Sequence, residues 1–162
     1  MIIKIKNIKI GYNYPPVIIA EISGNHNGSK KKFLHLIKSA CLNDADLIKI
    51  QTYEPKDITL KGKTQQFYIK DGIWKNNHLW NLYKKACTPF DWHQDAFKIA
   101  KKYKKLIFSS PFSLRAVDLL ESFDCQLYKI ASFEITDLKL IRYIASKKKP
   151  IIISTGMASA KE

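Results

Sequence analysis

Polar side chains of the kinds used in catalysis recur at the ends of five short apolar segments. The clearest case is "IIAEISGNHNGS" (residues 18–29), where a run of Ile and Ala carries Glu21 before the chain turns polar. A lone carboxylate in an apolar segment costs roughly several kcal/mol unless it has a partner, so its presence indicates a site. The whole set comprises Glu21, Ser23 and Asn25; Lys49 and Gln51; Ser109 and Ser110; Lys129, Ser132 and Glu134; and Ser154 and Thr155.

This set suits a small ligand that carries both a phosphate and a carboxylate. Lys49 and Lys129 would supply positive charge, and the serine hydroxyls would fix the geometry. The sequence contains neither G-x-x-x-x-G-K-[ST] nor G-x-G-x-x-G, which disfavours nucleoside triphosphates and dinucleotides. Singly, each residue has an ordinary alternative: a strand lysine can form an ion pair, a serine can cap a helix, and His26 can hydrogen-bond its own loop. Their joint occurrence favours a site.

The segments that carry these residues are predicted to be strands of a parallel sheet. Runs rich in Ile, Leu and Val lie between helical patterns, and strand–helix–strand spacing of roughly 20 to 30 residues is typical of right-handed βαβ units. Polar residues at the carboxyl ends of parallel strands are typical of the active-site edge of a (β/α) barrel or of an open-sheet crevice. Helix starts are predicted at Thr88-Pro89 and at Ser113. The strands are predicted at 17–22, 47–51, 106–110, 126–130 and 150–155.

Two segments depart from this alternation of strands and helices. Residues 1–16 alternate Ile with Lys around Asn7, which predicts a β-hairpin and not a signal peptide. Residues 52–87 form a long insertion in which "FYIKDGIWK" predicts a second hairpin and "NNHLWNLYKKA" predicts a short helix. Because loops of this length tend to be functional, and this one is rich in Trp and Tyr, we expect it to cover the site.

Composition limits the partners. A net charge of +14 raises the question of nucleic acid, but 26 of the 28 basic residues are Lys, and only Arg115 and Arg142 could form a bidentate fork. We therefore expect solvated lysine runs and no nucleic-acid partner. The three cysteines lack C-x-x-C spacing, which favours a reducing cytoplasm. No stretch approaches the ~20 apolar residues of a membrane span.

Five motifs in order, "IIAEISGNHNGS", "IKIQTY", "FSSPF", "YKIASFEITD" and "PIIISTGM", resemble the sialic acid synthase family, whose members condense phosphoenolpyruvate with an amino sugar on a (β/α)8 barrel. Finer features, "EISGNHNGS", "QTY", "LWNLYKKACTPFDWH" and "ASFE", are closer to pseudaminic acid synthases than to N-acetylneuraminate synthases. The resemblance implies an α/β fold, a partial TIM (β/α)8 barrel. Residues 17–162 would supply its first five parallel strands with intervening helices, and residues 1–16 the hairpin before them.

The resemblance also implies roles. In the family, C3 of phosphoenolpyruvate attacks the open-chain aldehyde of the sugar, water adds at C2, and phosphate departs, giving a nine-carbon nonulosonic acid for surface glycans. Glu21, Lys49 and Lys129 match catalytic positions, with Glu21 close to the reacting carbons. Lys49 and Lys129 also belong to the set that holds phosphoenolpyruvate, and Glu134 matches a position that binds an acetamido sugar. The implied substrate-binding residues are Asn25, Gln51, Ser110, Ser132, Glu134 and Ser154.

The chain departs from the family beyond its fifth strand. Family members use a divalent cation, Mn or Mg, held by two histidines on later strands, and they are homodimers in which an antifreeze-like domain covers the partner subunit's site. Residues 159–162 spell a capping box, so the sequence stops where a helix is predicted to start. We therefore expect a truncated barrel without metal ligands, and little or no synthase activity from these 162 residues alone.

Other functions stay open. A 3-deoxy-octulosonate or heptulosonate phosphate synthase would use the same chemistry on a sugar phosphate and would be revealed by its acceptor preference. A noncatalytic fragment, or a split subunit, would need a second chain to supply the remaining strands. A nucleic-acid binder would show salt-sensitive DNA binding.

Overall fold

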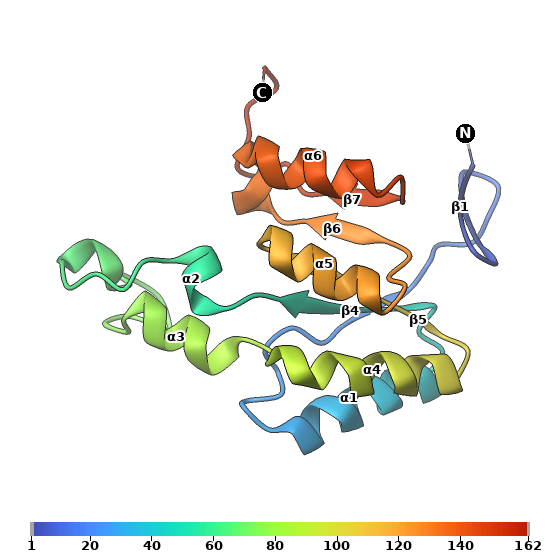
Figure 1. Cartoon of the computed structure of the whole chain (residues 1–162), viewed down its shortest axis with the longest axis horizontal. Helices are drawn as coiled ribbons and strands as arrows, with labels where there is room; N and C mark the ends of the chain where they lie inside the picture. The colour runs from blue at the N-terminus through green and yellow to red at the C-terminus, as the bar shows by residue number, and fades with distance from the viewer. Residues whose placement is uncertain (1, 162) are drawn as a thin grey trace.

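The five predicted strands form one parallel sheet in the computed structural model, which describes residues 2–161 (Figure 1). Their spatial order is their chain order, as in the wall of a (β/α) barrel and unlike a doubly wound sheet, whose order reverses. Each adjacent pair is parallel, so the predicted α/β partial barrel is confirmed. The strands are β3 (Ile19–Glu21), β4 (Leu47–Thr52), β5 (Leu106–Pro111), β6 (Tyr128–Ile130) and β7 (Ile151–Ile153).

Four helices cover the outer face of this sheet. In Figure 1, α1 lies beside α4 and α5 lies beside α6. Ile48 and Ile50 of β4 pack outward against Phe33, Ile37 and neighbouring side chains of α1 and α4, in one buried cluster. Because strand side chains alternate, residues 47, 49 and 51 point to the inner face. The helices are α1 (Lys30–Leu42), α4 (Phe90–Lys102), α5 (Leu114–Ser122) and α6 (Leu138–Ser146).

One of the two predicted helix caps is correct. The Ser113 hydroxyl caps α5 by accepting a hydrogen bond from the backbone N–H of Ala116 at 3.3 Å. The helix start predicted at Thr88-Pro89 is correct, since α4 begins at Phe90 with Pro89 as its N-cap residue, but Thr88 does not cap it, because its buried hydroxyl lies 3.2 Å from Nε2 of His26. The hydroxyl satisfies a buried imidazole instead of the end of a helix.

The N-terminal hairpin is confirmed as β1 (Ile3–Ile5) paired with β2 (Ile8–Ile10). Ile5 belongs to the same buried cluster as Leu47, Phe108 and Leu127, which lie near the amino ends of the central strands. The hairpin therefore lies at the opposite end of the sheet from the insertion (Figure 1). The division of the chain at residue 16 stays a prediction.

The insertion contains α2 (Pro55–Ile58), a 3-10 turn η1 (Gln65–Phe67) and the predicted helix, α3 (Leu79–Ala86). The predicted hairpin is reduced to a single antiparallel bridge between Tyr68 and His78. The Asp-Gly turn is present, with Gly72 at φ +79°, but Asn76 also has a positive φ of 66°. Two left-handed residues this far apart widen the loop beyond a two-residue turn, so the strands cannot extend.

The segment 62–78 within the insertion closes on itself. Nε2 of His78 donates to the carbonyl oxygen of Gly62 at 2.7 Å, and the imidazole stacks on Phe67 with ring centroids 6.3 Å apart. Gly62 runs so close to Phe67 that an added Cβ would lie 1.8 Å from its Cε2 atom. These contacts hold the base of the segment together without help from the sheet.

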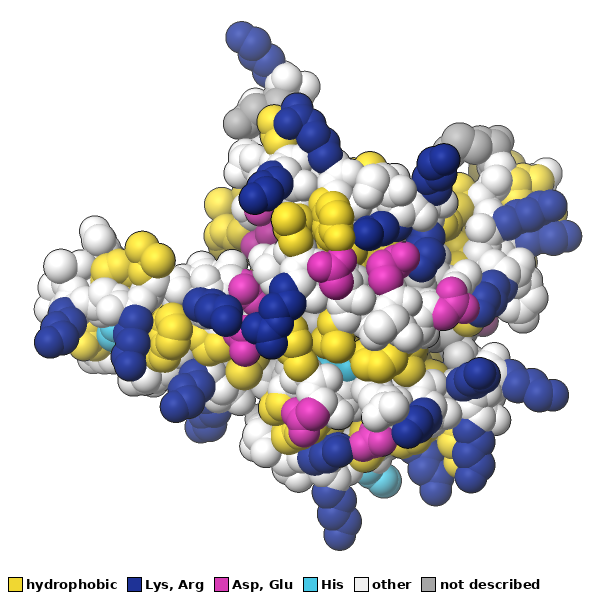
Figure 2. Space-filling view, in the orientation of Figure 1, with side chains coloured by type: hydrophobic (Ala, Val, Ile, Leu, Met, Phe, Trp, Pro, Cys, Tyr) yellow, Lys and Arg dark blue, Asp and Glu magenta, His cyan; other side chains and the backbone are white. Residues whose placement is uncertain are grey.

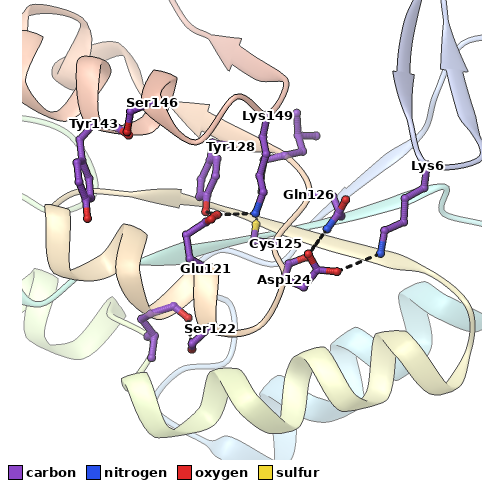
Figure 3. Close-up of polar contacts among 12 residues, drawn as sticks. Lys6, Glu121, Ser122, Asp124, Cys125, Gln126, Tyr128, Tyr143, Ser146 and Lys149 are labelled. Atoms are coloured by element: carbon purple, nitrogen blue, oxygen red, sulfur yellow. Dashed lines mark hydrogen bonds and ion pairs between the residues drawn. The ribbon is translucent and has the colours of Figure 1, made fainter.

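A polar cluster on the outer side joins three parts of the chain, α5, β6 and the turn before β7 (Figure 3). Glu121 of α5 accepts hydrogen bonds from the hydroxyl of Tyr128 and, at 2.6 Å, from Nζ of Lys149. Burial raises the pKa of Glu121, but the hydrogen bonds from Lys149 and Tyr128 outweigh it and hold that pKa below its usual range. The cluster fixes α5 against the last two strands.

Within residues 2–161, no helix is long and apolar enough to cross a bilayer. The helix start predicted at 159–162 includes Glu162, which lies outside the described residues.

Candidate functional site

The inner face of the sheet carries a row of polar residues at the carboxyl ends of its strands. Glu21 and Lys49 are register partners on β3 and β4, and Gln51 and Ser110 are register partners on β4 and β5. Partners in a parallel pair point to the same face, and Lys49 and Gln51 are two residues apart. The structure therefore brings all four predicted residues together on the inner face.

Glu21 and Lys49 form an ion pair, which answers the burial problem posed by the sequence. Lys49 is only 8% exposed, whereas 46% of the Glu21 side chain remains accessible. The other carboxylate oxygen of Glu21 accepts from the backbone N–H of Ser23 at 3.0 Å, and the Ser23 hydroxyl donates to Gln51 at 3.1 Å. The loop after β3 is thus held over the ion pair.

Lys129 of β6 extends this group of charges. Burial lowers its pKa, the nearby ammonium of Lys49 lowers it further, and the carboxylates of Glu21 and Glu134 oppose the shift. These four side chains, from β3, β4, β6 and the 3-10 turn η2 (Ser132–Thr136), therefore lie within electrostatic reach of one another. A bound anion would compensate both lysines and favour the charged form of Lys129.

Two buried oxygens near these charges have no hydrogen-bond partner among the described residues. They are Oγ of Ser110, whose residue is 1% exposed, and Oε2 of Glu134. Burial raises the pKa of Glu134, and the nearby Asp137 carboxylate adds to this effect. Because buried polar atoms in folded proteins are nearly always satisfied, these two atoms indicate a place for polar groups of a ligand.

The remaining predicted residues lie around this group. The Ser132 hydroxyl lies 3.6 Å from the point that a Cβ on Gly156 would occupy, so the loops after β6 and β7 meet there. The backbone N–H of Ser154 donates to Ile130 at 3.1 Å, which continues the β6–β7 pairing up to this residue. Asn25 is exposed in the loop after β3.

Ser109, which the sequence places with these residues, lies on the other face. Its buried hydroxyl is 2.6 Å from that of Thr52, which is 2.8 Å from Nε2 of His93 on α4. Nδ1 of His93 donates to the carbonyl of Pro89 at 3.1 Å. Burial lowers the pKa of His93 to about 4, so the imidazole is neutral at pH 7. Ser109 therefore joins the sheet to α4 and does not face a ligand.

His26 is a loop anchor, as its structural interpretation predicts. Nδ1 accepts from the backbone N–H of Gly28 at 3.0 Å, so the proton of the neutral ring is on Nε2, which contacts Thr88. The ring also meets Phe33 and Trp92 edge-on. The loop after β3 is thereby tied to the segment that leads into α4.

Sequence reasoning missed Tyr83, which the insertion brings towards the site. Burial and the Glu134 carboxylate both raise the pKa of Tyr83, so α3 lies within electrostatic reach of Glu134. Tyr83 contacts Tyr53 edge-on, and Tyr53 contacts Phe112 in the same way. The signal was available, because positions 79, 82, 83 and 86 form an apolar stripe at helical spacing.

The cation implied by the resemblance does not fit the residues present. Within the described range, no three or more His, Cys, Asp or Glu side chains are grouped so that they could hold a metal ion. Residues 2–161 alone therefore supply no such centre.

Comparisons with known proteins agree with this fold. Pseudaminic acid synthase of Helicobacter pylori is 48% identical over 151 residues, covering 91% of this chain and 44% of the relative. N,N'-diacetyllegionaminic acid synthase of Campylobacter jejuni is 35% identical over 147 residues, covering 90% of this chain and 44% of that relative. N-acetylneuraminic acid synthetase from Leptospira borgpetersenii, solved in complex with citrate, superposes with a TM-score of 0.83 at 29% identity, covering 99% of this chain and 52% of that one.

The chain thus spans less than half the length of either of the first two synthases. Residues 36–162, most of its length, match the model of one family, and this match confirms the predicted resemblance. The chain belongs to the NeuB family.

Proposed function

We propose that these residues form the phosphoenolpyruvate-binding half of a nonulosonic acid synthase, which condenses phosphoenolpyruvate with an acetamido sugar as a step towards surface glycans. The observation that carries the proposal is the convergence of Lys49, Lys129 and the unpartnered hydroxyl of Ser110 at one edge of the sheet. The named relatives, which make pseudaminic and legionaminic acids, support this class of product, and the 48% identity favours the pseudaminic branch.

Each residue has a role that its surroundings support. Lys49 and Lys129 would bind the phosphate and carboxylate, since charge-assisted hydrogen bonds are the stronger ones, and the hydroxyls of Ser110, Ser132 and Ser154 would complete the anion site. C3 of phosphoenolpyruvate would bond to the aldehyde carbon of the open-chain sugar. Water would then add at C2, and the C2–O bond to phosphate would break. The two ammonium groups would stabilise the charge that develops.

The acceptor sugar would lie on the side of Glu134 and the insertion. The unpartnered Oε2 of Glu134 can accept a hydrogen bond from a sugar hydroxyl or amide, and α3 brings Tyr83 to the same region. Glu21, with nearly half its side chain accessible and one oxygen paired to Lys49, would act close to the reacting carbons. Gln51 and Asn25 would line the rim.

Turnover is proposed to require more strands than these five. A sheet of five strands cannot close at the tilt of a barrel, and β3 and β7 are its two edges. We therefore expect the 162-residue chain to bind phosphoenolpyruvate but to turn over little until further strands close the barrel. A divalent cation, a homodimer and a cytoplasmic location remain part of the proposal for the closed enzyme.

The test is phosphoenolpyruvate binding by calorimetry to the wild-type chain and to Lys129→Met, with Lys70→Met as the control. Lys70 is exposed in the insertion loop and carries the same charge. We expect Lys129→Met to weaken binding at least tenfold, which is about 1.4 kcal/mol, and the control to change nothing. Equal binding by both variants would place the anion site elsewhere. Once further strands close the barrel, phosphate release with acetamido sugars, and not with sugar phosphates, would separate this activity from that of the 3-deoxy sugar-acid phosphate synthases.

A further inference from the structure

A cavity of about 590 Å³ lies at the end of the molecule opposite the carboxyl edge. It is enclosed by the turn of the N-terminal hairpin, the end of α4, the start of β5 and the loop between α5 and β6. This volume lies within the range of small-molecule sites. None of the residues of the candidate phosphoenolpyruvate site lines it. Its lining is Lys6, Asn7, Gln94, Phe97, Lys98, Ala100, Lys101, Lys104, Lys105, Leu106, Ile107, Phe123, Asp124 and Gln126.

The rim of this cavity is strongly basic. Five of its residues are lysines and one is an aspartate, and Lys6 pairs with that aspartate, Asp124, at 3.4 Å (Figure 3). No ion pair within residues 2–161 engages Lys101, Lys104 or Lys105. Figure 2 shows Lys and Arg side chains gathered at the end of the molecule where α4 ends. These ammonium groups exceed what the carbonyl end of one helix requires, so they favour an anionic ligand.

Two aromatic rings form an apolar part of the cavity lining. Phe97 of α4 and Phe123, which follows α5, lie with ring centroids 5.2 Å apart and a 33° tilt. Both rings are half-buried, and both line the cavity. A bare phosphate or carboxylate gains nothing from such a surface, whereas an aromatic ring gains buried apolar area and ring contacts.

Amide side chains supply the third element. Asn7, Gln94 and Gln126 line the cavity, and an amide both donates and accepts hydrogen bonds. Gln126 uses its Nε2 group on Asp124, which leaves its oxygen to accept (Figure 3). Paired donors and acceptors beside an aromatic surface match the polar edge of a nucleobase.

From these three features we propose that the cavity binds a nucleoside phosphate, with the base on Phe97 and Phe123 and the phosphate at Lys101, Lys104 and Lys105. The sequence lacks the motifs for nucleoside triphosphates and dinucleotides, and those motifs bind a phosphate in a glycine-rich loop before a helix. This site instead holds the phosphate with lysine side chains after a helix, so the absence of the motifs does not argue against it.

Calorimetry of the 162-residue chain with adenosine and cytidine monophosphates tests the proposal. We expect a dissociation constant below about 1 mM, and binding at least tenfold weaker for adenosine alone and for inorganic phosphate alone. The variant Lys101→Gln/Lys105→Gln should lose about tenfold in affinity. The matched control, Lys70→Gln/Lys75→Gln, changes the net charge equally at exposed positions in the insertion and should bind as the wild type does.

Four outcomes would overturn the proposal. They are no binding of either monophosphate, inorganic phosphate binding as tightly as the nucleotides, an equal loss in the control variant, and competition between nucleotide and phosphoenolpyruvate, which would put both ligands in one site. Circular dichroism on both variants checks for misfolding; Lys70, Lys75 and Lys101 are exposed and Lys105 is half-buried, and none of the four belongs to the buried core.

Discussion

Ser109 and Ser110 are consecutive residues of β5, and their hydroxyls lie on opposite faces of the sheet. The Ser109 hydroxyl donates to the carbonyl of Ile50 at 3.1 Å and meets Thr52 at 2.6 Å, beneath α4. The Ser110 hydroxyl is equally buried but has no partner among the described residues on the inner face. The hydroxyl of Ser109 is thus used in the protein's own hydrogen bonding, whereas that of Ser110, one residue later, is left available for the ligand we propose.

The two serines should respond oppositely to removal of the hydroxyl. We expect Ser109→Ala to lower the free energy of unfolding by about 1–3 kcal/mol, because Thr52 and Ile50 lose a buried partner. Ser110→Ala should leave that free energy within about 0.5 kcal/mol of wild type, or raise it, while weakening phosphoenolpyruvate binding. Urea titration and calorimetry on both variants measure the two quantities. The opposite ranking in stability would show that the faces are misassigned.

Acid should destabilise the fold through His93. Its pKa is about 4 in the folded chain and about 6.5 when unfolded, so between these values the unfolded state binds more protons. Stability is therefore complete above pH 6.5 and falls as the pH drops towards 4, by up to about 3 kcal/mol. Urea midpoints from pH 7.5 to 4.5 measure this loss.

The control for this prediction is His93→Gln, which keeps a hydrogen-bonding side chain and cannot take up the proton. Its stability should vary less with pH than that of the wild type. Some dependence should persist, because burial lowers the pKa of His26 in the same direction. If the free energy of unfolding of His93→Gln fell with pH as steeply as that of the wild type, His93 would not be the group responsible.

Lys49→Met should preserve the fold and abolish ligand binding. The Glu21 carboxylate keeps 46% of its surface accessible, so it can be hydrated when its partner is removed, and an apolar side chain of similar length suits a position that is 8% exposed. We expect the free energy of unfolding to change by less than about 1 kcal/mol. Thermal melts and phosphoenolpyruvate titrations would show a stable chain without affinity, whereas unfolding would mean that the ion pair is needed for the fold.

Glu121→Gln should destabilise the chain in a pH-dependent way. The pKa of this partly exposed carboxyl is held below its usual range in the fold, so its contribution is present above the unfolded value of about 4.5 and is lost as the pH falls below it. We expect a loss of about 1 kcal/mol at pH 7 after allowance for solvent screening. The free energies of unfolding of the wild type and the variant, measured with urea, should converge near pH 3. A difference that stays constant with pH would show that the negative charge of Glu121 is not the source of the stabilisation.

The parallel order of the strands was predictable, because apolar runs, helical patterns and polar strand ends recur in a fixed sequence. The pairing of Glu21 with Lys49 was also predictable from the cost of burying either charge alone. Thr88 shows where local patterns fail. A Thr before a proline resembles a helix cap, but the Thr88 hydroxyl contacts His26, 62 residues earlier in the chain. A contact between residues this far apart cannot be predicted from the local sequence.

Ser109 and Tyr83 show the same limit at the site. The sequence does not show which of two adjacent serines at a strand end points to the inner face of the sheet and which to the outer face. Tyr83 lies within electrostatic reach of Glu134 because the long insertion positions α3 there, and the sequence does not specify the path of a long loop.

The closure of segment 62–78 on itself has a practical consequence. Because the bond between His78 and Gly62 and the stacking on Phe67 hold the base of this segment, its exposed tip around Ile73 and Trp74 contributes little to the rest of the molecule. A fluorophore or an affinity tag could be attached there, or homologous loops of other lengths exchanged, without altering the candidate phosphoenolpyruvate site or the cavity lined by Phe97 and Phe123. The tip is the natural point at which to tether this protein for single-molecule or surface-based binding measurements.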